Sequence, residues 1–352
     1  MGKIRDIVHA LFNPRMVPAF VISLDALGTI YKFREPISKQ YIRVAQECGV
    51  RGSLDPAELD KAFRSSFKHY NAEYPNYGKG QLEGPEEWWT KVVNQAFGDL
   101  VGQDKIPGEL GTKLYHHFSS GAAYKLYPDV QPFLQSIRAL KNRYEQPGGP
   151  LVLTGVVTNS DPRVRLVLQD LGLQIGPSEP VRFDVRSMHA RASARSDPMQ
   201  AMVFEGFYNP RNDFDFLWTS YESGHEKPDA RIWRSAKHSM LPMMPIARAD
   251  VLYIASTEPS QRSTVEAMRQ NLDLTLDFRK LMWIHIGDDF SKDYVGAKEA
   301  ELNALLLKRD EVSTLLHKDH AVDDDAETVT SLGEATMVLN MMAQEHFREV
   351  RS

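Results

Sequence analysis

A carboxylate at the end of an apolar stretch is the first feature of this sequence that could do chemistry. Residues 21–24 are Val-Ile-Ser-Leu, Asp25 follows them, and a Gly28-Thr29 turn comes soon after. The pattern predicts a buried strand that presents Asp25 at the carboxyl edge of a sheet, where ligands bind in open α/β sheets. Asp25 is therefore a candidate nucleophile. Two residues later the chain has Leu27, an aliphatic residue that can neither donate nor accept a proton.

Three further motifs of polar residues occur along the chain, each at the end of an expected strand or the start of an expected helix. The second motif begins with Thr158 and Asn159 after an apolar stretch, and the third is Glu226-Lys227-Pro228-Asp229 before a helical pattern. The fourth, Gly287-Asp288-Asp289, follows another apolar stretch, and Asp293 comes soon after it. One such motif is a weak signal, whereas four in this order and context are a strong signal for fold and family.

The elements that would position these motifs alternate between strands and helices. Apolar, β-prone stretches predict strands over residues 19–26, 151–158, 214–219, 281–287 and 304–307. Helical periodicity and helix start signals predict helices over residues 129–141, 162–171, 229–239, 292–300 and 331–347. Strands that alternate with helices indicate an α/β fold with a Rossmann-like, doubly wound parallel sheet.

The segment after the first strand has helical patterns only, over residues 38–48, 56–69, 85–97 and 107–118. An insert of this size directly after the first strand is expected to form a cap over the sheet edge, with Trp88 and Trp89 as packing residues. We therefore expect a helical cap at 33–120 and a core made of 1–32 plus 121–352. Two stretches of the core, at about 174–212 and 243–280, are poorly patterned insertions. The second contains a strand-like stretch at 251–255 and a helix-like one at 259–269.

Together the four motifs resemble those of the haloacid dehalogenase (HAD) superfamily of aspartate-nucleophile hydrolases. The resemblance covers roughly residues 19–310 apart from the two insertions, and the helical block matches the family's C1-type cap. Smaller details resemble the eukaryotic group of haloacid dehalogenase-like hydrolase domain-containing protein 3, which is related to the rhythmically expressed gene 2 product of flies. These details are Pro75-Asn76-Tyr77-Gly78, Trp88-Trp89 and Thr219-Ser220-Tyr221-Glu222.

The resemblance implies a nucleophile and a metal. Asp25 would attack phosphorus and form an aspartyl-phosphate, which divides one difficult hydrolysis into two easier steps. The implied cofactor is Mg²⁺, which prefers oxygen ligands and often keeps several waters. Its implied ligands are Asp25, Asp288 and the backbone carbonyl of Leu27. Asp293 would lie behind these ligands and orient metal-bound waters or Lys227.

The resemblance also implies the substrate contacts. An anionic nucleophile that meets an anionic phosphate needs positive charge nearby, and Lys227 would supply it. Thr158 would donate its hydroxyl to a phosphoryl oxygen, and the backbone amide of Asn159, near a helix start, would donate as well. The leading expectation is a Mg²⁺-dependent phosphatase that acts on a small phosphorylated metabolite, with Asp25, Thr158 and Lys227 as its catalytic residues.

Leu27 departs from the phosphatase pattern, in which general acid catalysis is worth roughly 10²–10⁴-fold. The 2-haloacid dehalogenases also lack that acid, because a halide leaves without a proton, but they need no metal and have no pair such as Gly287-Asp288. Two alternatives therefore stay open. One is a carbon–halogen hydrolase of this kind, and the other is a weakly active or non-catalytic binding or regulatory protein on the same scaffold.

Composition narrows the possible partners. The chain has 352 residues, of which 42% are hydrophobic and 25% charged, as is ordinary for globular proteins. A net charge of −5 argues against a nucleic-acid binder, and no apolar run approaches the roughly 18 residues that span a bilayer. We expect a small-molecule substrate, without nucleic acid or membrane as partners.

Cys48 is the one cysteine and fits a reducing compartment, so we expect a cytoplasmic protein, with the nucleus and the mitochondrion as alternatives. The oligomeric state is not indicated.

Overall fold

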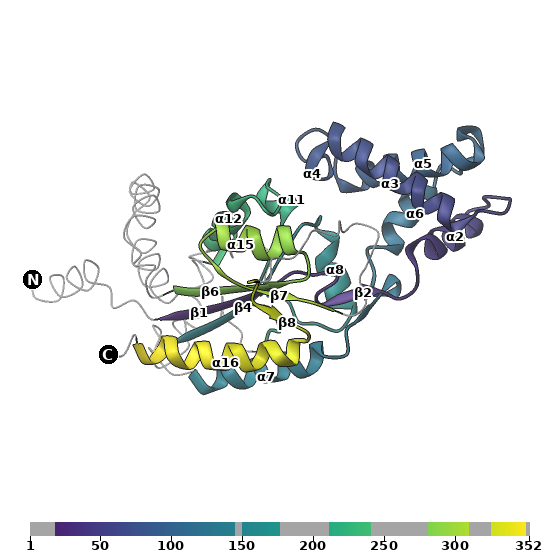
Figure 1. Ribbon diagram of the computed structural model, residues 1–352. Coiled ribbons are helices and arrows are strands. Elements are labelled where there is room, and N and C mark those ends of the chain that lie inside the picture. Colours follow the sequence, from purple (N-terminus) through teal and green to yellow (C-terminus); the bar gives the residue numbers. More distant parts are fainter. Residues whose placement is uncertain (1–17, 145–149, 177–210, 241–280, 310–324, 350–352) are drawn as a thin grey trace, which may run out of the picture.

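Six apolar segments form one parallel sheet in the computed structural model, which describes residues 18–144, 150–176, 211–240, 281–309 and 325–349 (Figure 1). The strands are β1 (Ala19–Leu24), β4 (Leu151–Thr158), β5 (Phe216–Thr219), β6 (Leu281–Gly287), β7 (Asn303–Leu307) and β8 (Thr328–Val329). Their order is β5-β4-β1-β6-β7-β8, and all neighbouring pairs are parallel. The predicted doubly wound α/β fold is confirmed. The direction in which strands are added reverses at β1, the kind of place where such sheets bind ligands.

Alternation along the strands divides the apolar core between the two faces of the sheet. Phe20, Ile22 and Leu24 of β1 belong to one buried cluster, and Val21 belongs to another, because successive side chains point to opposite faces. Helices among the described residues cover both faces of the sheet (Figure 1). They are α7 (Val130–Tyr144) and α16 (Leu332–Glu349) on one face, and α12 (Ala230–Met240) and α15 (Gly296–Glu299) on the other.

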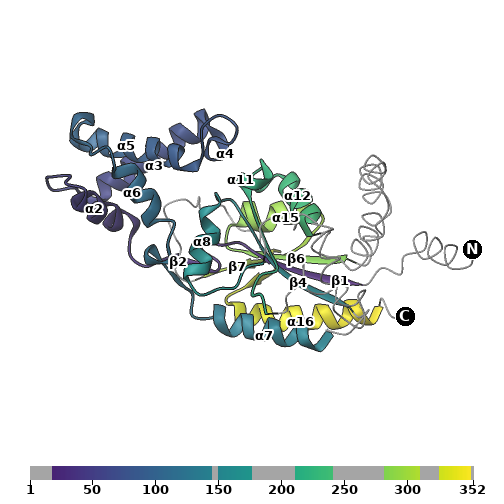
Figure 2. The same cartoon turned by 180° about the vertical axis from the view of Figure 1, so that it is seen from behind.

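A block of helices lies beyond one end of the sheet (Figure 2). Its members are α2 (Ile37–Glu47), α3 (Pro56–Glu73), α4 (Pro75–Gly78), α5 (Pro85–Val101) and α6 (Leu110–His117). Trp88 and Phe97 of α5 are completely buried inside it. The chain enters the block through β2 (Tyr31–Phe33) and leaves it through β3 (Tyr124–Leu126), and these two strands pair with each other as an antiparallel ribbon.

Within the described residues, the remaining helical segments are short. They are two 3₁₀ turns at Gln103–Lys105 and Gly121–Ala123, α8 (Arg163–Asp170), α11 (Ser220–Ser223) and a π-helix at Phe290–Val295. The π-helix corrects the predicted helix at 292–300, of which only Gly296–Glu299 is α-helical. It begins where the Asp289 side chain accepts from the backbone N–H of Lys292 at 2.9 Å, and such turns occur often at functional sites.

Some predicted segments lie outside the described residues, and some observed strands were not predicted. Most of the predicted insertions, including 251–255 and 259–269, lies outside the described residues, and the limits of core and cap stay predictions. The strands β2, β3 and β8 were not predicted, because runs of two or three residues are too short to show a period. Among the described helices, none is both long enough and apolar enough to cross a membrane.

Candidate active site

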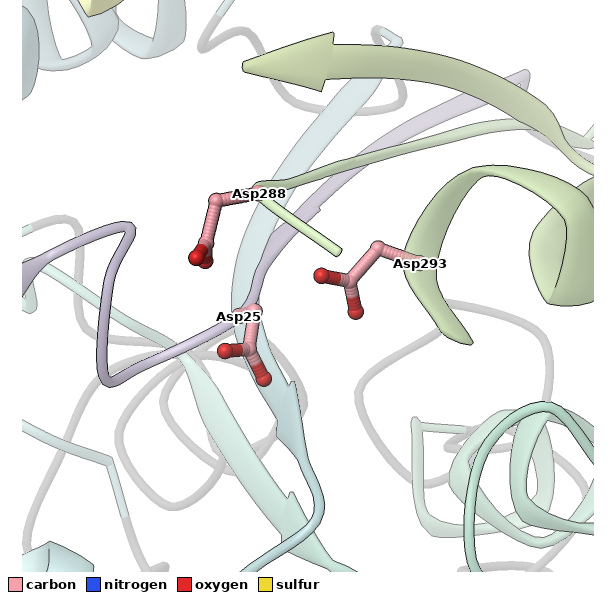
Figure 3. Close-up of side chains that lie close together, drawn as sticks. All are labelled: Asp25, Asp288 and Asp293. Atoms are coloured by element: carbon pink, nitrogen blue, oxygen red, sulfur yellow. The ribbon is translucent and has the colours of Figure 1, made fainter. Parts of the chain in front are cut away.

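The carboxyl ends of β1 and β6 bring three acidic side chains together (Figure 3). Asp25 follows β1, Asp288 follows β6, and Asp293 lies in the π-helix. Figure 3 shows the carboxylates gathered at one place, where one oxygen of each lies within 4.8 Å of the others. Because β1 and β6 are parallel neighbours, their carboxyl ends share one edge of the sheet. The structure therefore unites the acids of the first and fourth motifs.

Lys227 is the cation at this cluster. Its Nζ donates to Oδ1 of Asp25 and to Oδ1 of Asp293, each at 2.6 Å, and to the backbone carbonyl of Val157 at 2.9 Å. The residue is only 3% exposed, and its three ammonium hydrogens have three acceptors. Burial opposes the charge, but the two carboxylates outweigh burial and raise the pKa of Lys227 above its ordinary value. The ammonium therefore stays charged beside Asp25.

Asp293 is 2% exposed and accepts hydrogen bonds on both oxygens. Oδ1 accepts from Lys227 and, at 3.4 Å, from Nε2 of His285, while Oδ2 accepts from the backbone N–H of Asp289 at 3.0 Å. Burial alone would raise the pKa of Asp293, but Lys227 and His285 outweigh it and hold that pKa well below its ordinary value. Asp293 is therefore a fixed negative charge beneath the site.

Two glycines make room for the carboxylates. A Cβ on Gly28, whose φ is +95°, would overlap the carboxylate of Asp288, and a Cβ on Gly287 would overlap that of Asp293. At position 28 only glycine tolerates both the positive φ and the close approach. The hydroxyl of Thr29 donates to Oδ1 of Asp288 at 2.8 Å. The Gly-Thr turn of the first motif thus contacts the fourth motif directly.

The second and third motifs are joined through Asn159. Its Nδ2 donates to the backbone carbonyl of Lys227 at 2.9 Å, and its Oδ1 accepts from the Lys227 backbone N–H at 2.7 Å. Tyr77 of the helical block donates from Oη to the carbonyl of Asn159 at 3.1 Å. Thr158 ends β4, the other neighbour of β1, so it reaches the same sheet edge. The side chain of Asn159 therefore positions Lys227, a contact that the sequence did not reveal.

Leu27 is half-buried and packs against the main apolar cluster, and its backbone forms an isolated bridge with that of Tyr31. The position that would carry a general acid in a phosphatase is thus part of the packing around the first motif. An aliphatic side chain there can neither donate nor accept a proton.

Asp161 and Arg163 connect the loop after β4 to the helical block. Arg163 donates to both carboxylate oxygens of Asp161, and Nε1 of Trp89 donates to Oδ2 of Asp161 at 2.8 Å. The guanidinium of Arg163 lies 4.6 Å from the ring centre of Trp89 and 4.4 Å from that of Tyr115, where cation–π attraction is favourable. Trp89 was predicted to pack within the block, and it also makes this polar contact.

Sequence reasoning missed His285. It is fully buried in β6, where Nδ1 lies 2.8 Å from Oγ of Ser23. Burial lowers the pKa of His285, so the imidazole is neutral. The available signal was a polar residue in the middle of an apolar strand, since such a residue needs hydrogen-bond partners.

The donor set of the cluster consists of carboxylate oxygens from Asp25, Asp288 and Asp293. Three carboxylates lie beside the Lys227 ammonium, and like charges this close destabilise one another unless a cation balances them. Oxygen donors suit hard divalent cations. The cluster therefore fits a site for such a cation.

Comparison with known proteins places this chain among hydrolases. No family model matches it. Haloacid dehalogenase-like hydrolase domain-containing protein 3 of Danio rerio is 32% identical over 183 residues, which are 52% of this chain and 69% of that protein. The protein of the same name from Homo sapiens is 24% identical over 82% of this chain and 81% of its own length.

Among solved structures, a 2-haloacid dehalogenase from Pseudomonas syringae superposes with a TM-score of 0.47 at 16% identity, covering 93% of this chain and all of that one. The fold of this chain follows from its own strands, and its family follows from its sequence relatives. The four motifs lie at one edge of the sheet, and the Danio rerio protein is 32% identical over 69% of its length. The chain therefore belongs to the haloacid dehalogenase-like hydrolases.

Proposed function

We propose that this hydrolase is a Mg²⁺-dependent phosphatase that acts on a small phosphorylated metabolite, with Asp25 as the nucleophile. One observation carries the proposal: Lys227 bridges Asp25 and Asp293 at 2.6 Å each, and Asp288 lies in the same carboxylate cluster. A halide-releasing site has no need of so many carboxylates. A phosphatase uses them to hold a cation next to the phosphoryl group.

Asp25 and Asp288 would hold Mg²⁺, together with the backbone carbonyl of Leu27. Asp293 would support the site from below, because its two oxygens already accept from Lys227, His285 and the Asp289 backbone. When bound, the ion would neutralise the phosphoryl group that Asp25 attacks. Mg²⁺ often keeps several waters, so two carboxylates are sufficient.

The chain's own residues would carry the reaction in two steps. A carboxylate oxygen of Asp25 attacks phosphorus, the bond to the leaving oxygen breaks, and an aspartyl-phosphate forms. Water then attacks the phosphorus, the bond to Asp25 breaks, and inorganic phosphate leaves. Lys227 would balance the negative charge that gathers around Asp25 in both steps. Thr158 and the backbone amide of Asn159 would donate to the phosphoryl oxygens.

Leu27 limits which leaving groups can depart readily from the phosphoryl group. Without a general acid at this position, the leaving oxygen takes its proton from solvent, so groups that are stable as anions should leave best. The missing acid is worth roughly 10²–10⁴-fold for a poor leaving group. We therefore propose that aryl, enol or acyl phosphates are hydrolysed faster than simple alkyl phosphates.

Leu27 also favours a second candidate, a carbon–halogen hydrolase. There the carboxylate of Asp25 would displace a halide from carbon and form an ester, which water would then hydrolyse. A halide takes no proton when it leaves, so an aliphatic residue at position 27 is no disadvantage. Such a reaction gives no role to a cation held by Asp288.

The first test is hydrolysis of p-nitrophenyl phosphate with and without Mg²⁺, with Asp25→Asn as the control. The aryl group needs little protonation, so the assay does not depend on an acid at position 27. We expect Mg²⁺-dependent turnover that disappears in Asp25→Asn. Leu27→Asp should raise the rate on an alkyl phosphate and leave the aryl rate nearly unchanged.

Other outcomes separate the alternatives. Turnover of 2-chloropropionate by the metal-free protein would establish the carbon–halogen hydrolase and refute the phosphatase. No turnover of either substrate by folded protein, with a partner whose binding survives Asp25→Asn, would identify a binding or regulatory protein.

A further inference from the structure

Two polar residues form the floor of the site. Ser23 of β1 and His285 of β6 are partners in the sheet register. Side chains two residues apart share a face of a strand, so Ser23 lies below Asp25 and His285 lies below Gly287. Because Gly287 has no Cβ, the carboxylate of Asp293 fills the space beside it. His285 is thus placed between Ser23 and Asp293.

The hydrogen bonds that link Trp283, Ser23, His285 and Asp293 fit one assignment of donors and acceptors. Trp283 can only donate, and its Nε1–H lies 2.8 Å from Oγ of Ser23, which accepts. The Ser23 hydrogen is then directed to Nδ1 of His285, 2.8 Å away. The ionised Asp293 can only accept, so Nε2 of His285 carries the hydrogen that it donates to Oδ1 over 3.4 Å. A neutral imidazole with its hydrogen on Nε2 satisfies every partner.

The surroundings hold the imidazole ring in place. His285 and Ser23 are both 0% exposed. The ring of Trp233 meets the imidazole nearly edge-on, with centroids 4.5 Å apart and an angle of 71° between the planes. Burial of a polar ring costs free energy unless its nitrogens have partners. Here both nitrogens have partners, and one of those partners is the carboxylate that holds Lys227.

We propose that His285 is a positioning residue: its Nε2–H fixes the carboxylate of Asp293, which in turn holds the Lys227 ammonium beside Asp25. This rests on the proposed function, because the place of Lys227 matters for rate when Asp25 is the nucleophile. Without His285, Oδ1 of Asp293 keeps Lys227 as its one side-chain partner, and the carboxylate is held by two hydrogen bonds, from Lys227 and from the Asp289 backbone, in place of three. Residues that orient a ligating or catalytic group in this way typically contribute about 10–100-fold in activity.

A pair of amide substitutions tests the role of each ring nitrogen. In His285→Gln the side-chain amide reaches the place of Nε2 and can still donate to Asp293. In His285→Asn it reaches only the place of Nδ1, next to Ser23. A His285→Leu variant removes both bonds. His346→Leu is the matched control, because His346 is also buried, at 4% exposure, but lies in α16.

The kinetic readout is kcat and KM for p-nitrophenyl phosphate with saturating Mg²⁺. We expect His285→Asn and His285→Leu to lower kcat about 10–100-fold with little change in KM, and His285→Gln to recover most of the loss. His346→Leu should leave both constants near those of the unaltered protein. Equal losses in His285→Gln and His285→Asn, or no loss in either, would overturn the proposal.

A second readout does not depend on turnover or on folded variants. Two-bond ¹H–¹⁵N correlation spectra of the unaltered full-length protein reveal which nitrogen of His285 carries the hydrogen. A hydrogen on Nε2 supports the proposal, and a hydrogen on Nδ1 overturns it, since Asp293 would then receive nothing from the ring. If the protein hydrolyses no phosphate ester, the proposed function fails, and this spectrum still decides whether Nε2 of His285 donates to Asp293.

Discussion

Replacing Lys227 with methionine should destabilise the protein strongly, and the structure provides the magnitude. The ammonium is the shared partner of Asp25 and Asp293, whose side chains are 13% and 2% exposed. Methionine keeps much of the volume but removes the charge, so Asp293 stays buried without its cation. Removal of one partner of a buried ion pair costs about 3–5 kcal/mol. We expect the free energy of unfolding of Lys227→Met to fall by that amount at neutral pH.

The loss should depend on pH with a definite sign. The pKa of Asp293 is held below its ordinary value in the folded protein. Its ionisation therefore contributes stability above the unfolded-state pKa of about 4, and that contribution is lost as the pH falls through the folded-state value. The gap between Lys227→Met and the unaltered protein should be full at pH 7 and should shrink below about pH 4.

Urea unfolding followed by circular dichroism measures this free energy, with Lys292→Met as the control. Lys292 pairs with Asp289 at 2.9 Å, but its side chain is 38% exposed, and such surface pairs contribute only about 0–1 kcal/mol. If Lys227→Met lost no more stability than Lys292→Met, or if its loss were as large well below pH 4 as at pH 7, the reasoning from a buried shared cation would be refuted.

Two further predictions concern packing and charge away from the nucleophile. Gly28→Ala puts a Cβ against Asp288 at a φ of +95°, so we expect a loss of about 1–3 kcal/mol from the backbone alone and, in the p-nitrophenyl phosphate assay, loss of Mg²⁺-dependent turnover. Gly49→Ala, at a φ of +93° in open space, should lose stability but keep turnover, and a Gly28→Ala variant with normal turnover would contradict the close approach. Lys141→Met leaves Asp215 buried without its cation, 2.7 Å away, so chemical denaturation should show a loss of about 3–5 kcal/mol. Lys141→Met combined with Asp215→Leu should recover most of it, and a double variant as unstable as the single one would speak against this pair.

The parts of the fold that the sequence predicted are those with a long repeating signal. The strands around Asp25, Thr158 and Asp288 are apolar over enough residues to be recognised, and their ends carry the polar motifs. The two-residue strand β8 and the ribbon of β2 and β3 have no room for a period, and their pairing is decided by tertiary contacts. The π-helix at Phe290–Val295 begins with a hydrogen bond that the Asp289 side chain accepts from the Lys292 backbone N–H, and no periodicity encodes that bond.

The site shows the same division. The sequence predicted a site at Asp25, Lys227, Asp288 and Asp293 because their residue types and positions relative to predicted elements are distinctive, and the structure brings these four residues together. The contacts of the Asn159 side chain and of His285 depend on which residue lies opposite in three dimensions, and one sequence does not contain that information.

The chain enters and leaves the helical block side by side, through the antiparallel ribbon of β2 and β3. Phe33 faces Tyr124 in the ribbon, so the two ends of the intervening chain already lie side by side. Cutting out residues 34–123 and closing the gap with a tight two-residue turn of the Asn-Gly type would keep the register of β1 and β4. Asp25, Lys227 and the acidic cluster would all remain in the shortened protein. Grafting foreign helices onto the same two ends would then exchange one helical block for another without redesigning the sheet.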